Sequence, residues 1–417
     1  MNQPERDSLL KEGVVAKLLR YVQVDSPSGE GPGVPTTEEQ WQMARLLEAE
    51  LKALGLASVK VDEHAIVTAT LPGNLSGAPG IGLLAHFDTF PGTPGHGVKP
   101  QVHKQYDGGE IKLPAGGSIS PKTHPALALC VGHDIITSDG STLLGADDKA
   151  GVSEVMETLC RLLNDPSIKH GDIHVGFTPD EETGKGVGHF DVKNFKAVAA
   201  YTFDGSQLGE VESENFNAQN LKLTFTGRSA HTGTARGAMI NALQLAAEFI
   251  RSIPANMRAE TTSDYEGFIH PDSLEGSVEE VTVKILLRDF TSEGMAQKQE
   301  IVKGLLAGLE LRYPGSKTKL EVTGGYKNMN AFVGKDPRVV ELALQAVRAA
   351  GVEPIQKAIR GGTDGARLSE MGLPCPNLFT GGMNYHSRTE WASAQWMEKA
   401  VAVSLNLVKL WAEQGTK

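Results

Sequence analysis

The order of apolar strands and helices changes twice along this chain, and that order limits the folds available to it. In the first half, short apolar runs typical of buried strands occur at residues 81–85, 173–177 and 198–203. A helix with apolar residues at helical spacing is expected between them, at 151–163. Strands that alternate with helices form sheets covered on both faces, so this part of the chain predicts an α/β domain.

Signals for other elements flank this region. Apolar residues recur at helical spacing from 9 to 22, which predicts one helix. A second helix is expected after Thr36 and Thr37, with Glu39 and Gln40 as capping-box partners and Gly55 as its C-cap. Residues 91–117 are rich in Gly and Pro, so they are predicted to form a surface excursion and no part of the core.

A different order begins after about Val211. It consists of a strand at 221–225, a helix at 239–253, a short strand at 265–269, a strand at 278–290, a helix at 293–312 and a strand at 319–322. This is the β-α-β-β-α-β order of a small ferredoxin-like domain. Helices at 337–350 and 394–411 then resume the first pattern. We therefore expect a discontinuous catalytic domain, 1–212 and 326–417, interrupted by a lid- or dimerisation-type domain at 213–325.

Charge and hydropathy exclude two classes of partner. The chain has 417 residues and a net charge of −11, the wrong sign for a protein that grips phosphate backbones. No apolar run approaches the roughly 18 residues needed to span a bilayer. The first ten residues carry acids where a secretory leader has a basic and then an apolar stretch. A cytoplasmic protein without nucleic-acid or membrane partners is expected.

The cysteines indicate no special chemistry. Cys130, Cys160 and Cys375 are odd in number and show no CxxC spacing. Neither a disulfide framework nor a thiolate zinc site is therefore predicted, and we expect buried free thiols.

Histidines and acids gather at the ends of predicted strands and at the start of one helix. They stand in five segments, LLAHFDT, LLGADDKAG, FTPDEETG, TFDG and NYHSRTEW, and the residues concerned are His86, Asp88, Asp147, Asp148, Asp180, Glu181, Glu182, Asp204 and His386. The loops at strand ends build the sites of α/β sheets. His86 and Asp88 are two residues apart, so on extended backbone both face the same side, and the carboxylate can orient a metal-binding imidazole.

Each segment has an ordinary explanation when taken alone. An Asp before a helix is usually a cap, a run of acids is usually solvated, and a single His is usually structural or exposed. Several acids that end different strands of one sheet are a costly cluster of like charges unless cations neutralise them. Mixed imidazole and carboxylate ligands suit zinc or a related divalent metal, and a shared carboxylate suits a dinuclear site.

In this order, and with the insert before the last, the five segments resemble those of the M20 family of metallopeptidases. The segments TGRSAHTGTARGAMINA, ENFNA, YKNM and RGGTDGARLS resemble its peptidase T, or tripeptide aminopeptidase, branch. The resemblance covers residues 9–412. It implies a two-zinc aminopeptidase that removes the N-terminal residue of tripeptides, with cobalt or manganese as alternative metals.

The resemblance also implies roles for single residues. One metal is held by His86, Asp147 and Asp204, and the other by Asp147, Glu182 and His386. Glu181 is the general base and Asp88 clamps His86. His231 in SAHTG stabilises the oxyanion, and Arg288, Arg360 and Asn217 bind substrate.

Departures from the family pattern leave the substrate open. The sequence reads HTGTARG where HPGTAKG is expected, HFDTF is an unusual variant, and the loop after it is idiosyncratic. The alternatives are a dipeptidase, carboxypeptidase or N-acyl amino acid deacylase with the same metal centre, and a non-catalytic binding module. A short peptide is the expected partner, and a homodimer is a further expectation.

Overall fold

The computed structural model describes residues 3–415, and the chain forms two compact units. The first unit takes in the chain up to residue 213, residues 332–357 and the chain from residue 363 on. The second unit consists of residues 214–331 and 358–362. Residues 326–331 and 358–362, which the sequence interpretation gave to the catalytic domain, therefore lie in the second unit.

An eight-stranded mixed sheet is the centre of the first unit. Its strands, in spatial order, are β1 (Ala57–Val61), β2 (Val67–Leu71), β8 (Ile173–Thr178), β3 (Ile81–His86), β9 (Ala200–Gly205), β16 (Asn377–Phe379), β10 (Glu210–Asn215) and β15 (Ile355–Ile359). Strand β3 pairs in parallel with β8 on one side and β9 on the other. Every residue of β3 and β8 is buried, which explains why both strands are mostly apolar and show no alternation of apolar and polar residues.

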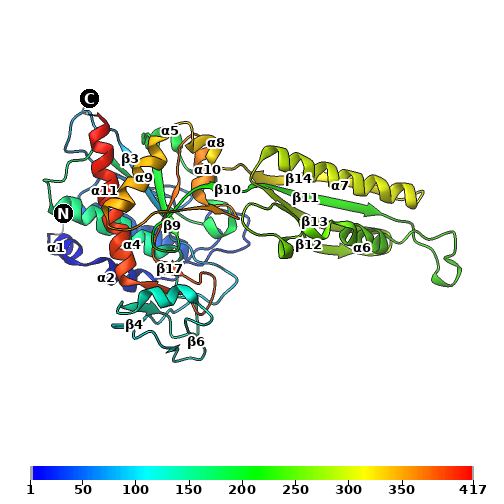
Figure 1. Cartoon of the computed structure of the whole chain (residues 1–417), viewed down its shortest axis with the longest axis horizontal. Coiled ribbons are helices and arrows are strands. Elements are labelled where there is room, and N and C mark those ends of the chain that lie inside the picture. The colour runs from blue at the N-terminus through cyan, green and yellow to red at the C-terminus, as the bar shows by residue number, and fades with distance from the viewer. Residues whose placement is uncertain (1–2, 416–417) are drawn as a thin grey trace. The chain divides into compact units, whose positions relative to one another are not determined.

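Helices cover both faces of this sheet, as predicted for an α/β domain. Figure 1 shows seven of them around the strands: α1 (Gln3–Lys11), α2 (Val14–Tyr21), α4 (Ala146–Asn164), α5 (Val192–Phe195), α9 (Arg338–Ala349), α10 (Asp364–Glu370) and α11 (Ala394–Ala412). Helix α3 (Gln40–Leu54) also belongs to this unit. Neighbouring residues of β9 show the two faces. Tyr201 donates to the carbonyl of Val339 in α9 and accepts from Nε1 of Trp411 in α11. Ala200 packs on the other face with Phe190 and Phe195.

Two predictions about the N-terminal helices are wrong in detail. The helix expected at 9–22 is two helices, because Gly13 has extended backbone (φ −76°, ψ 168°) and acts as the N-cap of α2. Helix α3 begins without the predicted capping box, since its N-cap Glu39 makes no side-chain capping bond. Its predicted end is confirmed, with Gly55 left-handed at φ 85°.

The Gly- and Pro-rich segment 91–117 contributes to a small core of its own. It holds β4 (Gln101–His103) and β5 (Ile111–Lys112); β5 pairs with β6 (Ser118–Ile119), and β4 is the edge of a sheet in the order β17 (Gly382–Met383), β18 (Trp391–Ser393), β7 (Ile135–Thr137), β4. Tyr106, Ile111 and Leu113 are buried in one cluster with Trp391 and Trp396. The expectation of a surface excursion is therefore wrong for these apolar residues, which stand singly between turn residues.

The second unit has the predicted ferredoxin-like order. Along the chain it runs β11 (Asn217–Thr226), α6 (Ala242–Ser252), β12 (Phe268–Gly276), β13 (Glu280–Asp289), α7 (Ser292–Arg312) and β14 (Lys317–Tyr326). The four strands form an antiparallel sheet in the order β12-β13-β11-β14. Alternate residues of β11 and β13 are buried in one cluster with α6 and α7, so both helices cover the same face.

The expected state of the cysteines is confirmed. Cys130, Cys160 and Cys375 are buried free thiols. Within residues 3–415, none of the helices combines the length and apolarity that crossing a membrane requires.

Replacing Phe225 with Ala should destabilise the second unit by about 3–5 kcal/mol, because its ring is fully buried against Phe249 at a centroid distance of 5.6 Å. Native-state hydrogen exchange of peptides from residues 217–326 measures this loss. Thr224→Ala, on the opposite face of the same strand, is the control and should cost less than about 1 kcal/mol. Equal losses in the two variants would contradict the assigned core.

Candidate metal centre

The carboxyl ends of three neighbouring strands bring the predicted ligands together in the first unit. His86 is the last residue of β3, Asp204 lies at the end of β9, and the acids 180–182 follow β8 after a single residue, Pro179. Because these strands are parallel neighbours, their ends meet at one edge of the sheet. Helix α4 begins at the same edge and supplies Asp147.

Asp147 lies between two imidazoles. Its Oδ1 is 3.0 Å from Nε2 of His86, and its Oδ2 is 3.1 Å from Nε2 of His386. His86 Nε2 is also 3.5 Å from Oδ1 of Asp204. His386 Nε2 is 2.9 Å from Oε2 of Glu182. One oxygen of Asp147 thus lies beside His86 and the other beside His386. A carboxylate that bridges two metal ions has this arrangement.

Two groups of donor atoms are close enough to hold an ion. One is His86, Asp148 and Asp204, and the other is His86, Asp147 and Glu182; within each group the donor atoms lie within 4.8 Å of one another. Asp148 is an additional donor that the predicted ligand set did not include. Its carboxylate accepts hydrogen bonds from the backbone N–H of His86 and of Gly151, each at 3.1 Å, so it also fixes the end of β3.

Asp88 holds His86 and the acidic turn together. Its Oδ1 is 3.2 Å from Nδ1 of His86, a contact that orients the imidazole with Nε2 toward the cluster. The same carboxylate accepts from the backbone N–H of Glu181 at 3.0 Å and of Glu182 at 3.3 Å.

The acids of the cluster are electrostatically crowded. Burial, and next the charge of Asp204, raise the pKa of Glu181 well above its usual value. Burial and the neighbouring Asp147 raise the pKa of Glu182 to about 7. Burial raises the pKa of Asp147, but its hydrogen bonds with His386 and His86 outweigh this effect and lower the pKa to about 2. Bound cations relieve such crowding, because they favour the ionised form of every acid around them.

Comparison with known proteins places this geometry in a family. The model of peptidase family M20/M25/M40 matches residues 144–410. The chain belongs to this family.

Relatives agree over almost the whole length. The chain is 45% identical over 409 residues to peptidase T of Geobacillus thermodenitrificans, an alignment that covers 97% of this chain and 100% of that one. Its fold resembles that of aminopeptidase PepT from Bacillus cereus, with a TM-score of 0.77 and 24% identity over 96% of this chain and 98% of that one. A tripeptidase from Staphylococcus aureus gives a TM-score of 0.78 with 23% identity, at 96% and 98% coverage.

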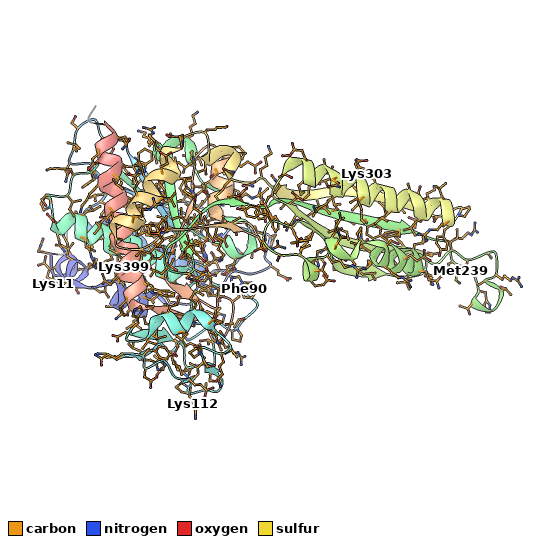
Figure 2. All side chains as sticks on the ribbon, viewed as in Figure 1. Lys11, Phe90, Lys112, Met239, Lys303 and Lys399 are labelled. Carbon is orange, nitrogen blue, oxygen red and sulfur yellow. The ribbon has the colours of Figure 1, made fainter. Side chains whose placement is uncertain are left out.

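The contacts of two residues at this M20 site, Glu390 and Phe90, were not predicted. The carboxylate of Glu390 is buried and accepts from the backbone N–H groups of Leu144, Gly145 and Asp147 at 2.7, 2.8 and 2.9 Å, which fixes the start of α4. Phe90, labelled in Figure 2, stacks on the imidazole of His386 with centroids 4.0 Å apart. Both residues stand inside segments already singled out, NYHSRTEW and HFDTF, so the only available signal was their nearness to a predicted ligand.

The remaining predicted residues belong to the second unit. His231 is exposed, and its Nδ1 accepts from the backbone N–H of Gly233 at 3.1 Å. The guanidinium of Arg288 lies 5.7 Å from the centroid of the Tyr326 ring and donates to the carbonyl of Leu287 at 2.9 Å.

Arg360 and Asn217 make backbone contacts in that unit. Arg360 donates to the carbonyls of Thr262, Asp264 and Glu266, and its guanidinium lies over the ring of Phe216. The amide of Asn217 donates to the carbonyls of residues 289 and 290 and accepts from the backbone N–H of residue 328. Their roles in substrate binding stay predictions.

The side chains of the first unit fit divalent metal ions. Oε1 of Glu182 is buried and has no hydrogen-bond partner in the described structure, although a carboxylate oxygen normally finds one. Two imidazoles and several carboxylates form a donor set suited to zinc and to other divalent first-row metals. The candidate ligands are His86, Asp147, Glu182, Asp204 and His386, with Asp148 beside them.

Metal binding and catalysis should separate at two adjacent positions. Glu182→Gln should lower the metal content, because it removes an anionic ligand. Glu181→Gln should keep the metal while kcat falls by about 10²–10⁴, the usual scale for loss of a general base. Elemental analysis and steady-state kinetics on both variants measure this. Equal metal loss in the two variants would contradict the assignment.

Proposed function

We propose that this chain is a metal-dependent aminopeptidase that hydrolyses the N-terminal residue from tripeptides. The observation that carries the proposal is Asp147, whose two oxygens each lie about one hydrogen-bond length from a different histidine, with Glu181 at the adjoining turn. The chain's near full-length similarity to peptidase T supports the substrate class. Two zinc ions per chain are the proposed cofactor, with cobalt or manganese as functional substitutes.

Glu181 is the proposed general base. Two divalent ions held by the ligand set would make water acidic enough to supply a nucleophile at neutral pH and would polarise the scissile carbonyl. Glu181 takes the proton from the attacking water and delivers it to the leaving amine. The backbone N–H of Glu181 donates to Asp88, and this bond fixes the backbone position from which the Glu181 side chain extends.

His231 is the proposed oxyanion donor. Since Nδ1 accepts a hydrogen bond from Gly233, the neutral imidazole carries its proton on Nε2, and that N–H is available to a substrate oxygen. An N–H donor aimed at the developing negative charge lowers the barrier to acyl transfer. Arg288, Arg360 and Asn217 are proposed substrate contacts, with Arg360 as the residue that binds the substrate's carboxylate.

The cytoplasm is the proposed location. Three buried free cysteines and no disulfide among the described residues suit a reducing compartment.

A net charge of −11 supports the absence of a nucleic-acid partner. A homodimer is a further proposal, for which the second unit is the candidate interface.

A peptide panel tests the substrate class. Free tripeptides should be cleaved. Acetylating the amino group should lower kcat/KM by at least about 30-fold, because it removes the substrate's positive charge and leaves the protein group that binds this charge unpaired. Free and blocked di-, tri- and tetrapeptides are compared with the zinc-loaded protein. Preference for the acetylated compounds would indicate a deacylase, and preference for dipeptides or for release of the C-terminal residue would indicate the corresponding peptidase.

Replacing His231 with Ala should reduce kcat by about 10²–10³, the loss measured for one oxyanion donor. Metal content should stay unchanged, since His231 lies in the second unit and the ligands lie in the first. The exposed neighbour variant Thr232→Ala is the control and should retain its activity. An unchanged kcat in His231→Ala would remove this residue from the mechanism.

A further inference from the structure

The turn that carries Glu181 is held by side chains at three consecutive backbone N–H groups. Asp180 donates from its N–H to Oε1 of Gln40 at 3.1 Å, whereas the N–H groups of Glu181 and Glu182 donate to the two oxygens of Asp88. Asp180 has a left-handed backbone, with φ at 55°. A non-glycine residue in this region is strained and persists only when its surroundings hold it there.

Gln40 and Thr36 provide that support from one side. Nε2 of Gln40 donates to Oδ1 of Asp180 at 2.8 Å, so the amide contacts both the backbone and the side chain of the same residue. The backbone N–H of Thr36 donates to Oδ2 of Asp180 at 2.7 Å, and the Thr36 hydroxyl donates to Oδ1. Gln40 and Asp180 are both fully buried. We call these three residues the Asp180 clamp.

Helix α3 has apolar residues of its own that pack it onto the unit. Met43, Leu47 and Leu51 on the same helix are fully buried apolar residues and account for that packing. Gln40 instead places a polar amide in the core and directs both of its polar ends at residue 180. A buried amide lowers the stability of the fold unless it is hydrogen-bonded. The orientation of the Gln40 amide is therefore fixed by its two hydrogen bonds with Asp180.

We propose that Gln40 and Thr36 are positioning residues for the general base. The clamp fixes the left-handed turn at Asp180, and this turn sets the direction from which Glu181 approaches the reacting water. The inference rests on the proposed function, because it assigns the purpose of the clamp through Glu181. Misplacing a catalytic group by about 1 Å costs on the order of 10² in rate, so a loosened clamp should lower kcat and leave KM nearly constant.

Exchanging the polarity of the clamp tests this. Gln40→Glu alone places two carboxylates side by side, and Asp180→Asn alone places two amides there. The double variant restores one carboxylate facing one amide. We expect each single variant to lose about 10- to 100-fold in kcat and the double variant to recover most of it, with KM and zinc content close to wild type in all three. Gln42→Ala, an exposed residue on the same helix, is the control.

Melting temperature and zinc content, measured on the same samples, separate positioning from simple stabilisation. A purely structural clamp would lower the melting temperature of the single variants and restore it in the double variant while kcat stayed constant; that result would overturn the proposal. Loss of zinc in step with kcat would overturn it too. If Gln40→Glu does not fold, Thr36→Val, which replaces the hydroxyl with a methyl group of similar size, should still lower kcat more than KM. An unchanged kcat in that variant would overturn the proposal.

The kinetics are run on the best substrate of the peptide panel, whatever its length. A result that favours acetylated peptides or dipeptides contradicts the proposed substrate class and leaves the clamp testable on that substrate. The two failures are therefore distinguishable.

Discussion

The parallel pairing of β8, β3 and β9 is the constraint on which the rest of the first unit depends. It brings three strand ends to one edge of a sheet, and each end carries a histidine or an acid. Carboxylates gathered in this way repel one another, and burial makes the repulsion stronger. The edge is therefore stable only with cations or shared protons. Asp88 and Glu390 accept hydrogen bonds from the backbone N–H groups of Glu181 and Asp147, and these bonds hold the acidic turn and the start of α4 against that repulsion.

The fold was predictable where local patterns carried the information. The strands predicted at 221–225 and 278–290 correspond to β11 and β13 of the second unit, and Gly55 predicted the end of α3. Predictions failed where a distant residue decided the local structure. Thr36 was assigned to a capping box, but its hydroxyl is used by Asp180, 144 residues away. A pattern of a few neighbouring residues, such as a capping box, contains no information about a competing partner so far away in the sequence.

The same reasoning applies to the site. His86, Asp147, Glu182, Asp204 and His386 were identified from their segments, and the structure brings these five side chains into contact in one unit. The bonds of Glu390 to the start of α4 span up to 246 residues, so the sequence contained no sign of which backbone groups it would bind. The stacking of Phe90 on His386 spans a similar separation and was equally inaccessible.

The positions of the cysteines give the first unit an internal reporter. All three thiols lie in it, fully buried, and burial raises the pKa of Cys130 and Cys160 to about 12. Alkylating reagents react with the thiolate, and here the thiols are both buried and protonated. Modification therefore requires the unit to open. The second unit contains no cysteine among its residues. The rate of thiol modification therefore follows local opening of the first unit alone, because the second unit has no thiol to contribute.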